Sequence, residues 1–194
     1  MRTESLTGAA AGAVLDDLAR LRIAVFRDYP YLYDGDLAYE RRYLVPYAES
    51  AGGVVVAAFD GDRVVGAATG LPLADEPAHV AAPFVAAGID PAEVFYLGES
   101  VLLPEYRGRG LGHAFFDGRE ARARALGLKT CAFCAVVRPA AHARRPAGWR
   151  PLDPFWTARG YACRPDMETA FSWRDLGEPE ETAKPMRFWL RTLA

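Results

Sequence analysis

The chain has 194 residues, of which 51% are hydrophobic and 25% are charged, and its formal net charge at pH 7 is -2. This length can bury one sizeable core, so we expect a single domain over residues 1–194. The nearly balanced charge excludes bulk electrostatic attraction to nucleic acid or to an anionic membrane as the main function.

The N-terminal third predicts one short strand and two helices. The strand is expected at residues 3–7, and leucines at helical spacing predict a helix over residues 11–28. The segment 29–35 contains proline and glycine and ends that helix. A second helix is expected over residues 36–49, with Asp36 as its N-cap.

The rest of the chain alternates strands with helices. A hairpin is expected at residues 52–73 around the turn signal Asp60-Gly61. The elements expected after it are a short helix and loop at 75–92, a strand at 92–103, a helix from 109 to 126, a strand at 128–137, a basic loop at 138–150, a helix at 151–160, and strands at 161–173 and 183–190. This order is typical of a single α/β or α+β domain.

The termini and the cysteines indicate no export, membrane span or metal. The N-terminal segment lacks the continuous apolar run of a signal peptide, and no stretch approaches 18 apolar residues, so we expect a cytoplasmic protein. Cys131 and Cys134 form a C-x-x-C on a predicted strand. Residues three apart on a strand point to opposite faces, so these thiols are expected to be buried hydrophobes.

The segment LLPEYRGRGLGHAFF, residues 102–116, places three glycines between a predicted strand and a predicted helix. A helix N-terminus presents unpaired N–H groups and partial positive charge, and glycine lets a ligand approach the backbone. A phosphate or pyrophosphate is therefore the expected ligand. The dinucleotide fingerprint G-x-G-x-x-G fails because His113 stands at its third glycine, and the P-loop fails because its lysine is missing.

Residues 107–112, RGRGLG, match the signature Q/R-x-x-G-x-G/A of the GNAT superfamily of acyl-CoA-dependent N-acyltransferases. The flanking segment 95–112 resembles the strand, turn and helix of polyamine-type members, and PFWTARGYA at 154–162 resembles the late helix motif. The resemblance implies a mixed, mostly antiparallel sheet of six to seven strands flanked by about four helices. A splayed strand pair is expected to form a wedge for coenzyme A.

The resemblance also assigns an acetyl-CoA site. The pyrophosphate is expected on the turn, and the pantetheine arm is expected to pair with the preceding strand as an added strand would. The residues this implies are Ser100, Val101 and Leu102 for the pantetheine arm, and Arg107, Gly108, Arg109, Gly110, Leu111, Gly112 and His113 for the phosphates.

Glu99 is the candidate catalytic base, because it stands one residue before the pantetheine segment in an otherwise apolar strand. The alternative is that Glu99 pairs with an arginine or orients a loop. Many relatives carry a tyrosine in the late helix near the sulfur, whereas this chain has Trp156, which has no ionisable proton. Solvent, Tyr96 or His142 is left to protonate the thiolate.

Relatives build the acceptor site from the first two helices and the loop between the last two strands. The candidates here are aromatic and acidic, and such a mouth favours a cationic amine. The alternative is that the tyrosines are packing residues and the acids are solvated loop charges. The candidate residues are Phe26, Asp28, Tyr31 and Tyr33, with Asp34, Asp36, Tyr39, Asp175, Glu178, Glu180 and Glu181 around them.

The resemblance therefore predicts transfer of acetyl from acetyl-CoA to an amine by direct attack in a ternary complex, with a small cationic molecule as one expected acceptor. The enzyme is expected to use no metal, to bind no nucleic acid or membrane, and to be a monomer or a homodimer. A non-catalytic acyl-CoA sensor remains the alternative, favoured by the missing tyrosine. A nucleotide-binding enzyme that prefers ATP or NAD is a third possibility.

Overall fold

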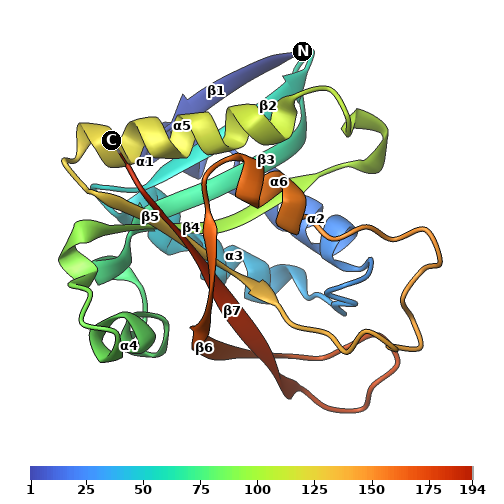
Figure 1. Cartoon of the computed structure of the whole chain (residues 1–194). Coiled ribbons are helices and arrows are strands. Elements are labelled where there is room, and N and C mark those ends of the chain that lie inside the picture. The colour runs from blue at the N-terminus through green and yellow to red at the C-terminus, as the bar shows by residue number, and fades with distance from the viewer. Residues whose placement is uncertain (194) are drawn as a thin grey trace.

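The computed structural model describes residues 1–193 and builds them around one seven-stranded sheet (Figure 1). The strand order is β1-β2-β3-β4-β5-β7-β6, and every neighbouring pair is antiparallel except β4 and β5. The strands are β1 (Arg2–Leu6), β2 (Val54–Asp60), β3 (Arg63–Pro72), β4 (Val94–Leu102), β5 (Thr130–Val136), β6 (Ala162–Trp173) and β7 (Thr182–Thr192).

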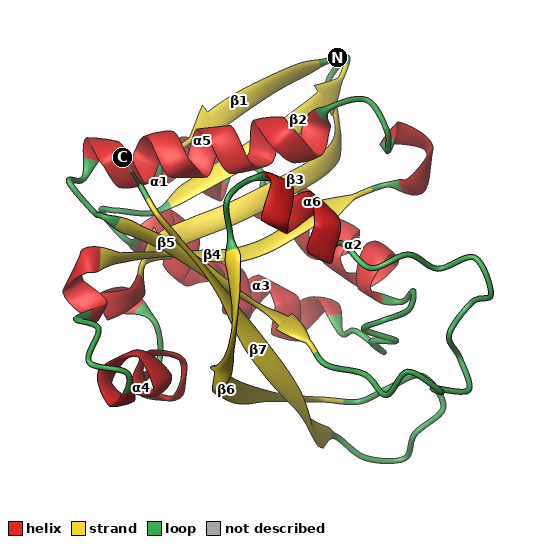
Figure 2. Cartoon of the chain, in the orientation of Figure 1, coloured by secondary structure: helices red, strands yellow, loops and turns green. Residues whose placement is uncertain are grey.

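Helices cover both faces of this sheet (Figure 2). α5 and α6 pack on one face, α1 to α3 pack on the other over β2 and β3, and α4 packs beside β6. The helices are α1 (Gly8–Gly12), α2 (Leu15–Phe26), α3 (Leu37–Glu49), α4 (Ala78–Ala86), α5 (Leu111–Ala125) and α6 (Asp153–Ala158), with short 3-10 turns η1 (Leu73–Asp75), η2 (Pro91–Glu93) and η3 (Pro104–Tyr106).

The predicted mixed α/β fold is confirmed, with corrections at the helices. Four helices exceed six residues, as expected, but α1 and α6 are two further short ones. The single helix predicted over residues 11–28 is wrong, because the chain breaks between Gly12 and Leu15, where Val14 leaves the helical conformation. Glycine lowers helix propensity at this break, and Asp16 and Asp17 favour a new helix N-terminus after it.

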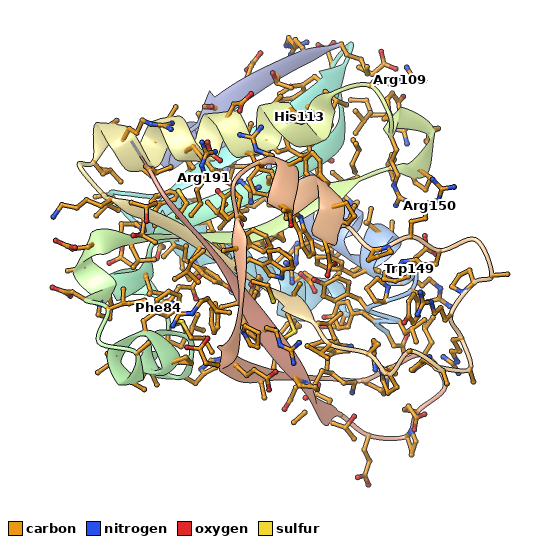
Figure 3. The ribbon with its side chains drawn as sticks, in the orientation of Figure 1. Phe84, Arg109, His113, Trp149, Arg150 and Arg191 are labelled. Atoms are coloured by element: carbon orange, nitrogen blue, oxygen red, sulfur yellow. The ribbon has the colours of Figure 1, made fainter. Side chains whose placement is uncertain are left out.

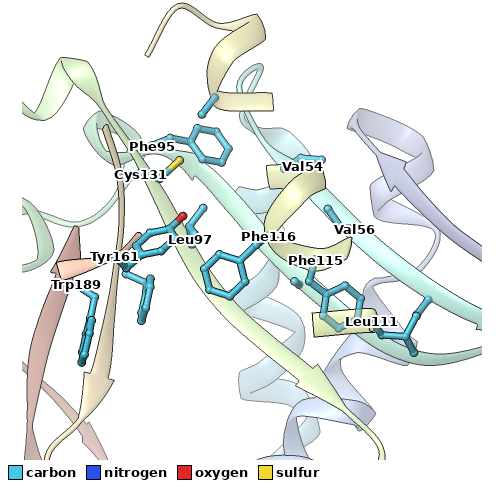
Figure 4. Close-up of a cluster of buried hydrophobic side chains, with 14 of the residues drawn as sticks. Val54, Val56, Phe95, Leu97, Leu111, Phe115, Phe116, Cys131, Tyr161 and Trp189 are labelled. Atoms are coloured by element: carbon cyan, nitrogen blue, oxygen red, sulfur yellow. The ribbon is translucent and has the colours of Figure 1, made fainter. Parts of the chain in front are cut away.

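The core under α5 is aromatic (Figure 4). Phe115 and Phe116 of α5 lie in one buried cluster with Phe95 and Leu97 of β4. Each such side chain contributes about 1.5–3 kcal/mol of transfer free energy when it is removed from water. This packing fixes the N-terminus of α5 relative to the end of β4.

Within residues 1–193, β4 and β5 are the only parallel neighbours, and they separate after three paired positions. Val94 to Tyr96 pair with Thr130 to Ala132, and no further pairing of β4 with β5 follows within residues 1–193. β5 continues with β7 to Val136, whereas β4 continues with β3 to Leu102. The expected splayed pair is therefore present, with its open end toward the N-terminus of α5.

A β-bulge interrupts β4 at the start of the open segment. Ala68 pairs with Ser100 but Gly70 pairs with Leu97, so Thr69 lies opposite two residues, Gly98 and Glu99. A bulge re-aims the side chains that follow it. It turns Glu99 away from the α5 face and toward α2 and α3.

No helix among the described residues is both long and apolar enough to cross a membrane.

Candidate active site

The α5 turn, residues 107–112, is built from backbone rather than from side chains. Gly108 and Gly110 have φ angles of 75° and 81°, a left-handed conformation that glycine adopts at little cost. Gly110 is the N-cap, so α5 begins at Leu111 and not at the predicted Arg109. Within residues 1–193, the N–H groups from Gly108 to Gly112 have no hydrogen-bond acceptor.

These free donors point out from the positive end of a 15-residue helix. Such an end suits a phosphate group, because several N–H groups can donate to one anion. The N–H of His113 already donates to the Gly110 carbonyl at 3.0 Å, so the donor set lies ahead of it. Figure 3 shows His113 on α5 and Arg109 at the turn before it.

The two arginines of the turn are exposed and each is attached to nearby backbone. Arg107 donates to the Leu102 carbonyl at 3.3 Å, and Arg109 donates to the Glu105 carbonyl at 2.9 Å. The Arg109 guanidinium also lies 5.4 Å from the centre of the Tyr106 ring. Both charges are thereby held close to the turn and add to its positive potential.

The open edge of β4 carries unpaired backbone groups. The Leu103 N–H donates to the Val65 carbonyl of β3, and N–H directions alternate along an antiparallel strand. The backbone of Ser100 and Leu102 therefore faces away from β3, into the gap that β5 leaves. The Val101 side chain is fully buried in the core under α2 and α3, so its side chain takes no part in this edge.

A pocket lies on the opposite side of the sheet from α5, where the wedge begins. Its volume is about 100 Å³, which is room for a few water molecules or for the reacting end of an amine. Eight of its fourteen lining residues are aromatic. We call this cavity the Glu99 pocket; its lining is Arg22, Phe26, Tyr31, Tyr33, Tyr39, Tyr43, Tyr96, Gly98, Glu99, Cys134, Phe171, Ser172, Trp173 and Met186.

A buried arginine bridges two buried carboxylates at the wall of this pocket. Arg22 of α2 donates through Nη1 to Glu99 of β4 and through Nε to Glu40 of α3. Glu40 is fully buried, and Glu99 and Arg22 are 6% and 8% exposed, so all three charges have left bulk water. Such a cluster is stable only while it is complete, because removal of one member leaves an unpaired buried charge.

Two neighbouring elements hold Glu99 from its other side. The Thr69 hydroxyl of β3 donates to Glu99 Oε1 at 2.8 Å. Arg119 of α5, which is 2% exposed, donates to the carbonyls of Glu99 and Thr69 at 3.1 and 3.3 Å and to Ser100 Oγ at 2.9 Å. Burial lowers the pKa of Arg119 to about 10, so the guanidinium stays charged at neutral pH. The bulge is thus stabilised from both faces of the sheet.

The two environments of Glu99 oppose one another. Burial raises the pKa of this carboxyl above its ordinary value, whereas Arg22 and the Thr69 hydroxyl lower it. The net direction is upward. Glu99 therefore combines the two interpretations that the sequence left open, because it pairs with an arginine and also faces the pocket.

The predicted acceptor residues separate into two groups. Phe26, Tyr31 and Tyr33 line the Glu99 pocket, whereas Asp28 is exposed and does not. The loop that carries Tyr31 and Tyr33 is joined to the last loop by the Tyr33–Asp175 bridge and by the hydrogen bond from the Leu176 N–H to the Leu32 carbonyl. The last loop therefore lies against the loop between α2 and α3.

Two of the acids predicted at the mouth are paired with arginines. Asp34 contacts Arg174 at 2.6 Å, and Asp175 contacts Arg138 at 2.8 Å. Arg138 also donates to the Tyr31 carbonyl at 2.8 Å, which fixes that pocket residue. These cations cancel part of the acidic charge at the mouth.

The structure separates the candidate proton donors. Trp156 of α6 packs on Phe133 and Trp189, with ring centres 5.0 and 5.2 Å away, and does not line the pocket. His142 lies in the basic loop at residues 138–150, with its ring centre 5.6 Å from that of Tyr29. The same loop carries Trp149 and Arg150, which Figure 3 labels. The Tyr96 hydroxyl faces the pocket, 3.2 Å from the sulfur of Cys134.

Sequence reasoning missed most of the charged and tyrosine side chains around Glu99. Two signals were present: a charged residue inside the apolar stripe of α2, and three tyrosines at i, i+4 spacing on α3. The residues missed are Arg22, Glu40, Tyr43, Tyr47, Thr69, Glu76 and Arg119.

Comparison with known proteins places these features in a family context. The model of the acetyltransferase (GNAT) family matches residues 15–145. Within residues 1–193, no three side chains of the usual ligand types are grouped to hold a metal ion. A search of curated proteins returned no match.

Solved structures of low sequence identity share the fold. A ribosomal-protein-alanine N-acetyltransferase from Brucella melitensis superposes with a TM-score of 0.64 at 15% identity, over 100% of both chains. A PaiA N-acetyltransferase from Thermoplasma acidophilum in complex with coenzyme A gives 0.59 at 11%, also over 100% of both chains. An aminoglycoside 6'-N-acetyltransferase complexed with coenzyme A gives 0.58 at 14%, over 99% of this chain and 97% of the other.

Proposed function

The chain belongs to the GNAT acetyltransferase family, and from this premise we propose that it transfers the acetyl group of acetyl-CoA to the amine of a small cationic molecule. The observation that carries the proposal is the position of the wedge. The open edge of β4 runs between the α5 turn and the Glu99 pocket. An acetyl-CoA molecule lying along this edge would reach from the anion site at the α5 turn to the Glu99 carboxylate in the pocket.

The proposed acetyl-CoA site uses most of the residues that the sequence predicts. The free N–H groups of the turn, with Arg107 and Arg109, suit the pyrophosphate. The unpaired backbone groups of Ser100 and Leu102 suit the amide-rich pantetheine arm, which adds to β4 as a strand. The proposed phosphate-binding residues are Arg107, Gly108, Arg109, Gly110, Leu111 and Gly112, while the N–H of His113 stays bonded to the Gly110 carbonyl. The proposed pantetheine-binding residues are Ser100 and Leu102, with Val101 between them directing its backbone groups toward β3.

Acetyl-CoA supplies the acetyl group as a thioester, whose carbonyl carbon forms the new bond to nitrogen while its bond to sulfur breaks. A backbone N–H of the open β4 edge donates to the carbonyl oxygen as negative charge develops there. Glu99 is the carboxylate that receives the acceptor's ammonium group, and its upward-shifted pKa makes it a stronger base than a free glutamate. The ammonium must lose one proton before attack, since only the neutral amine has a lone pair.

Tyr96 is the proposed hydrogen-bond donor to the departing sulfur. It lines the pocket at the last position where β4 and β5 pair, and its hydroxyl already contacts a sulfur, that of Cys134. Burial raises the pKa of Tyr96, so its hydroxyl keeps its proton. Trp156 has no such proton and packs elsewhere.

The pocket walls favour an ammonium group attached to a slender body. Tyr31, Tyr33 and Tyr43 offer aromatic faces that attract a cation. The two carboxylates Glu40 and Glu99 carry two negative charges against the single positive charge of Arg22, which leaves one net negative charge in the cluster. Recognition therefore takes place inside the pocket, because the acids Asp34 and Asp175 at the mouth are paired with arginines.

The test measures free thiol released from acetyl-CoA with a panel of polyamines, aminoglycosides and amino acids. We expect cationic amines to be acetylated and Glu99→Gln to lower kcat about a hundredfold or more. The matched control is Glu168→Gln, an exposed carboxylate paired with Arg187 on β7, which is expected to keep full activity.

Two results would contradict parts of this proposal. Preference for neutral or anionic acceptors would refute the cationic substrate. Binding of acetyl-CoA without thiol release for any amine would indicate a sensor. The proposed parts all lie on this sheet or on helices and turns packed against it, which supports the single catalytic domain predicted over residues 1–194.

A further inference from the structure

A chain of phenol hydroxyls leads out of the Glu99 pocket to a second carboxylate. Tyr43 of α3 lines the pocket, and its hydroxyl lies 3.4 Å from that of Tyr47, one turn further along the helix. The Tyr47 hydroxyl donates to Glu76 Oε1 at 3.1 Å. Glu76 follows η1 and is half-buried, so its carboxyl has access both to the chain and to solvent.

The position of the Tyr47 hydroxyl depends on the bulge of β4. Tyr47 is 2% exposed, and a Cβ on Gly98 would lie 2.3 Å from its hydroxyl and 2.6 Å from the Thr69 hydroxyl. The absence of a side chain at Gly98 therefore lets both hydroxyls reach β4 beside Glu99. Gly98 itself lines the pocket.

The two carboxylates differ in what surrounds them. Arg22 donates to one oxygen of Glu99 and Thr69 donates to the other, so both oxygens are engaged. Glu76 accepts from a neutral phenol and faces two acids, Asp75 on its own segment and Glu99 on β4. The pKa of Glu76 is raised to about 7, because burial and the two neighbouring acids raise it more than the Tyr47 hydrogen bond lowers it.

We propose that Glu76 is the final acceptor of the proton that the amine loses, and that Tyr43 and Tyr47 carry this proton out of the pocket. The inference rests on the proposed acetyl transfer. The ammonium gives one proton to the Tyr43 hydroxyl, Tyr43 gives its own to Tyr47, and Tyr47 gives its own to the Glu76 carboxylate. The result is a neutral amine, two unchanged phenols and one carboxylic acid, which then releases its proton to solvent.

In this arrangement Glu99 holds the ammonium in place while Glu76 removes the proton. Two carboxylates in one site take different roles when their surroundings separate their pKa values. The Tyr43–Tyr47 distance is long for a hydrogen bond between hydroxyls, and catalytic contacts often shorten once substrate is bound.

The test is the pH profile of kcat/KM for wild type, Glu76→Gln and Tyr47→Phe. We expect wild-type activity to rise tenfold per pH unit up to about pH 7, where Glu76 ionises. Both variants should lose this rising part of the pH profile, and their kcat/KM at pH 7.5 should be about tenfold to a hundredfold lower than that of wild type. Glu93→Gln, an exposed carboxylate paired with Lys129, is the control and should keep the wild-type profile.

Acetyl-CoA affinity, measured by calorimetry, should stay unchanged in both variants, and circular dichroism checks their folding. If Glu76→Gln does not fold, Tyr47→Phe decides alone, because it keeps the ring and removes only the hydroxyl. If wild type is active and Tyr47→Phe keeps the same rise of kcat/KM up to about pH 7, this inference is overturned and the proposed function still stands. An inactive wild type with every amine instead overturns the proposed function.

Discussion

The α5 turn and the Glu99 pocket are built in opposite ways. The turn is an exposed run of consecutive residues whose donors are backbone N–H groups. The pocket wall is a set of buried side chains from α2, α3, β3 and β4, held to one another by charge. The donor side therefore depends on local backbone conformation, and the acceptor side depends on distant elements meeting.

This difference has an energetic consequence. A residue of the turn can change without affecting the core, so its substitution should alter ligand affinity more than folding. A residue of the buried cluster holds charges that water no longer solvates, so its substitution should alter folding first. Four substitutions test this contrast, in order of decreasing expected effect.

Arg22→Met should destabilise the fold most, by about 3–5 kcal/mol, because it leaves Glu40 and Glu99 buried without their cation. The pKa of Glu99 is already raised in the folded wild type and should rise further. A raised folded-state pKa means that stability is present at low pH and is lost as pH increases. Urea denaturation at pH 5 and pH 8 measures both effects.

Arg20→Met is the matched control, since Arg20 lies on the same helix in an exposed pair with Asp17. We expect it to change stability by less than about 0.5 kcal/mol. If both variants lost the same free energy of unfolding, the buried cluster would contribute no more to stability than an exposed ion pair.

Gly110→Val should weaken acetyl-CoA binding without preventing folding. A β-branched residue at φ 81° costs about 1–3 kcal/mol, so KM for acetyl-CoA should rise roughly fivefold to a hundredfold. Gly88→Val is the control, because Gly88 has φ 73° and equally open surroundings but lies far from the turn along the chain, after α4. A similar KM in both variants would contradict a binding role for the turn.

Thr69→Val keeps the shape of the side chain and removes the hydroxyl that donates to Glu99. We expect a loss of about 1–2 kcal/mol in the free energy of unfolding and a severalfold lower kcat. Thr169→Val removes an exposed hydroxyl that donates to the His79 carbonyl at 2.9 Å, and it should leave kcat unchanged. Thermal unfolding and steady-state kinetics give the two readings, and an unaffected Thr69→Val would remove Thr69 from the pocket wall.

Arg174→Gln should have the smallest effect, because it acts only on the mouth. Removing this partner at 2.6 Å leaves Asp34 with only the longer contact to Arg27 at 3.9 Å, so KM for a diamine should fall twofold to threefold, about what an exposed charge pair is worth. The effect should vanish in 0.5 M salt, where exposed charges are screened. Arg164→Gln, which frees Asp166 on β6, is the control, and salt-independent changes would contradict an electrostatic mouth.

Short-range patterns explain most of what the sequence predicts correctly. The Asp36 N-cap accepts from the Tyr39 N–H at 2.8 Å, and the hairpin turns at Gly61, as expected. Cys131 and Cys134 belong to different cores, as expected for opposite faces of a strand. The long helix predicted through Gly12 is wrong because propensity at one position outweighed the hydrophobic spacing.

The sequence alone determined the family and the α5 turn, because glycine conformations and helix N-termini depend on neighbouring residues only. Glu99 was also visible, as a lone acid in an apolar strand. Only the tertiary structure decided that Arg22 and Glu40 meet Glu99, that Asp34 and Asp175 pair with arginines, and that Tyr47 connects the pocket to Glu76. Those contacts join residues far apart in the chain, and a buried charge reveals its partner only once the chain has folded around it.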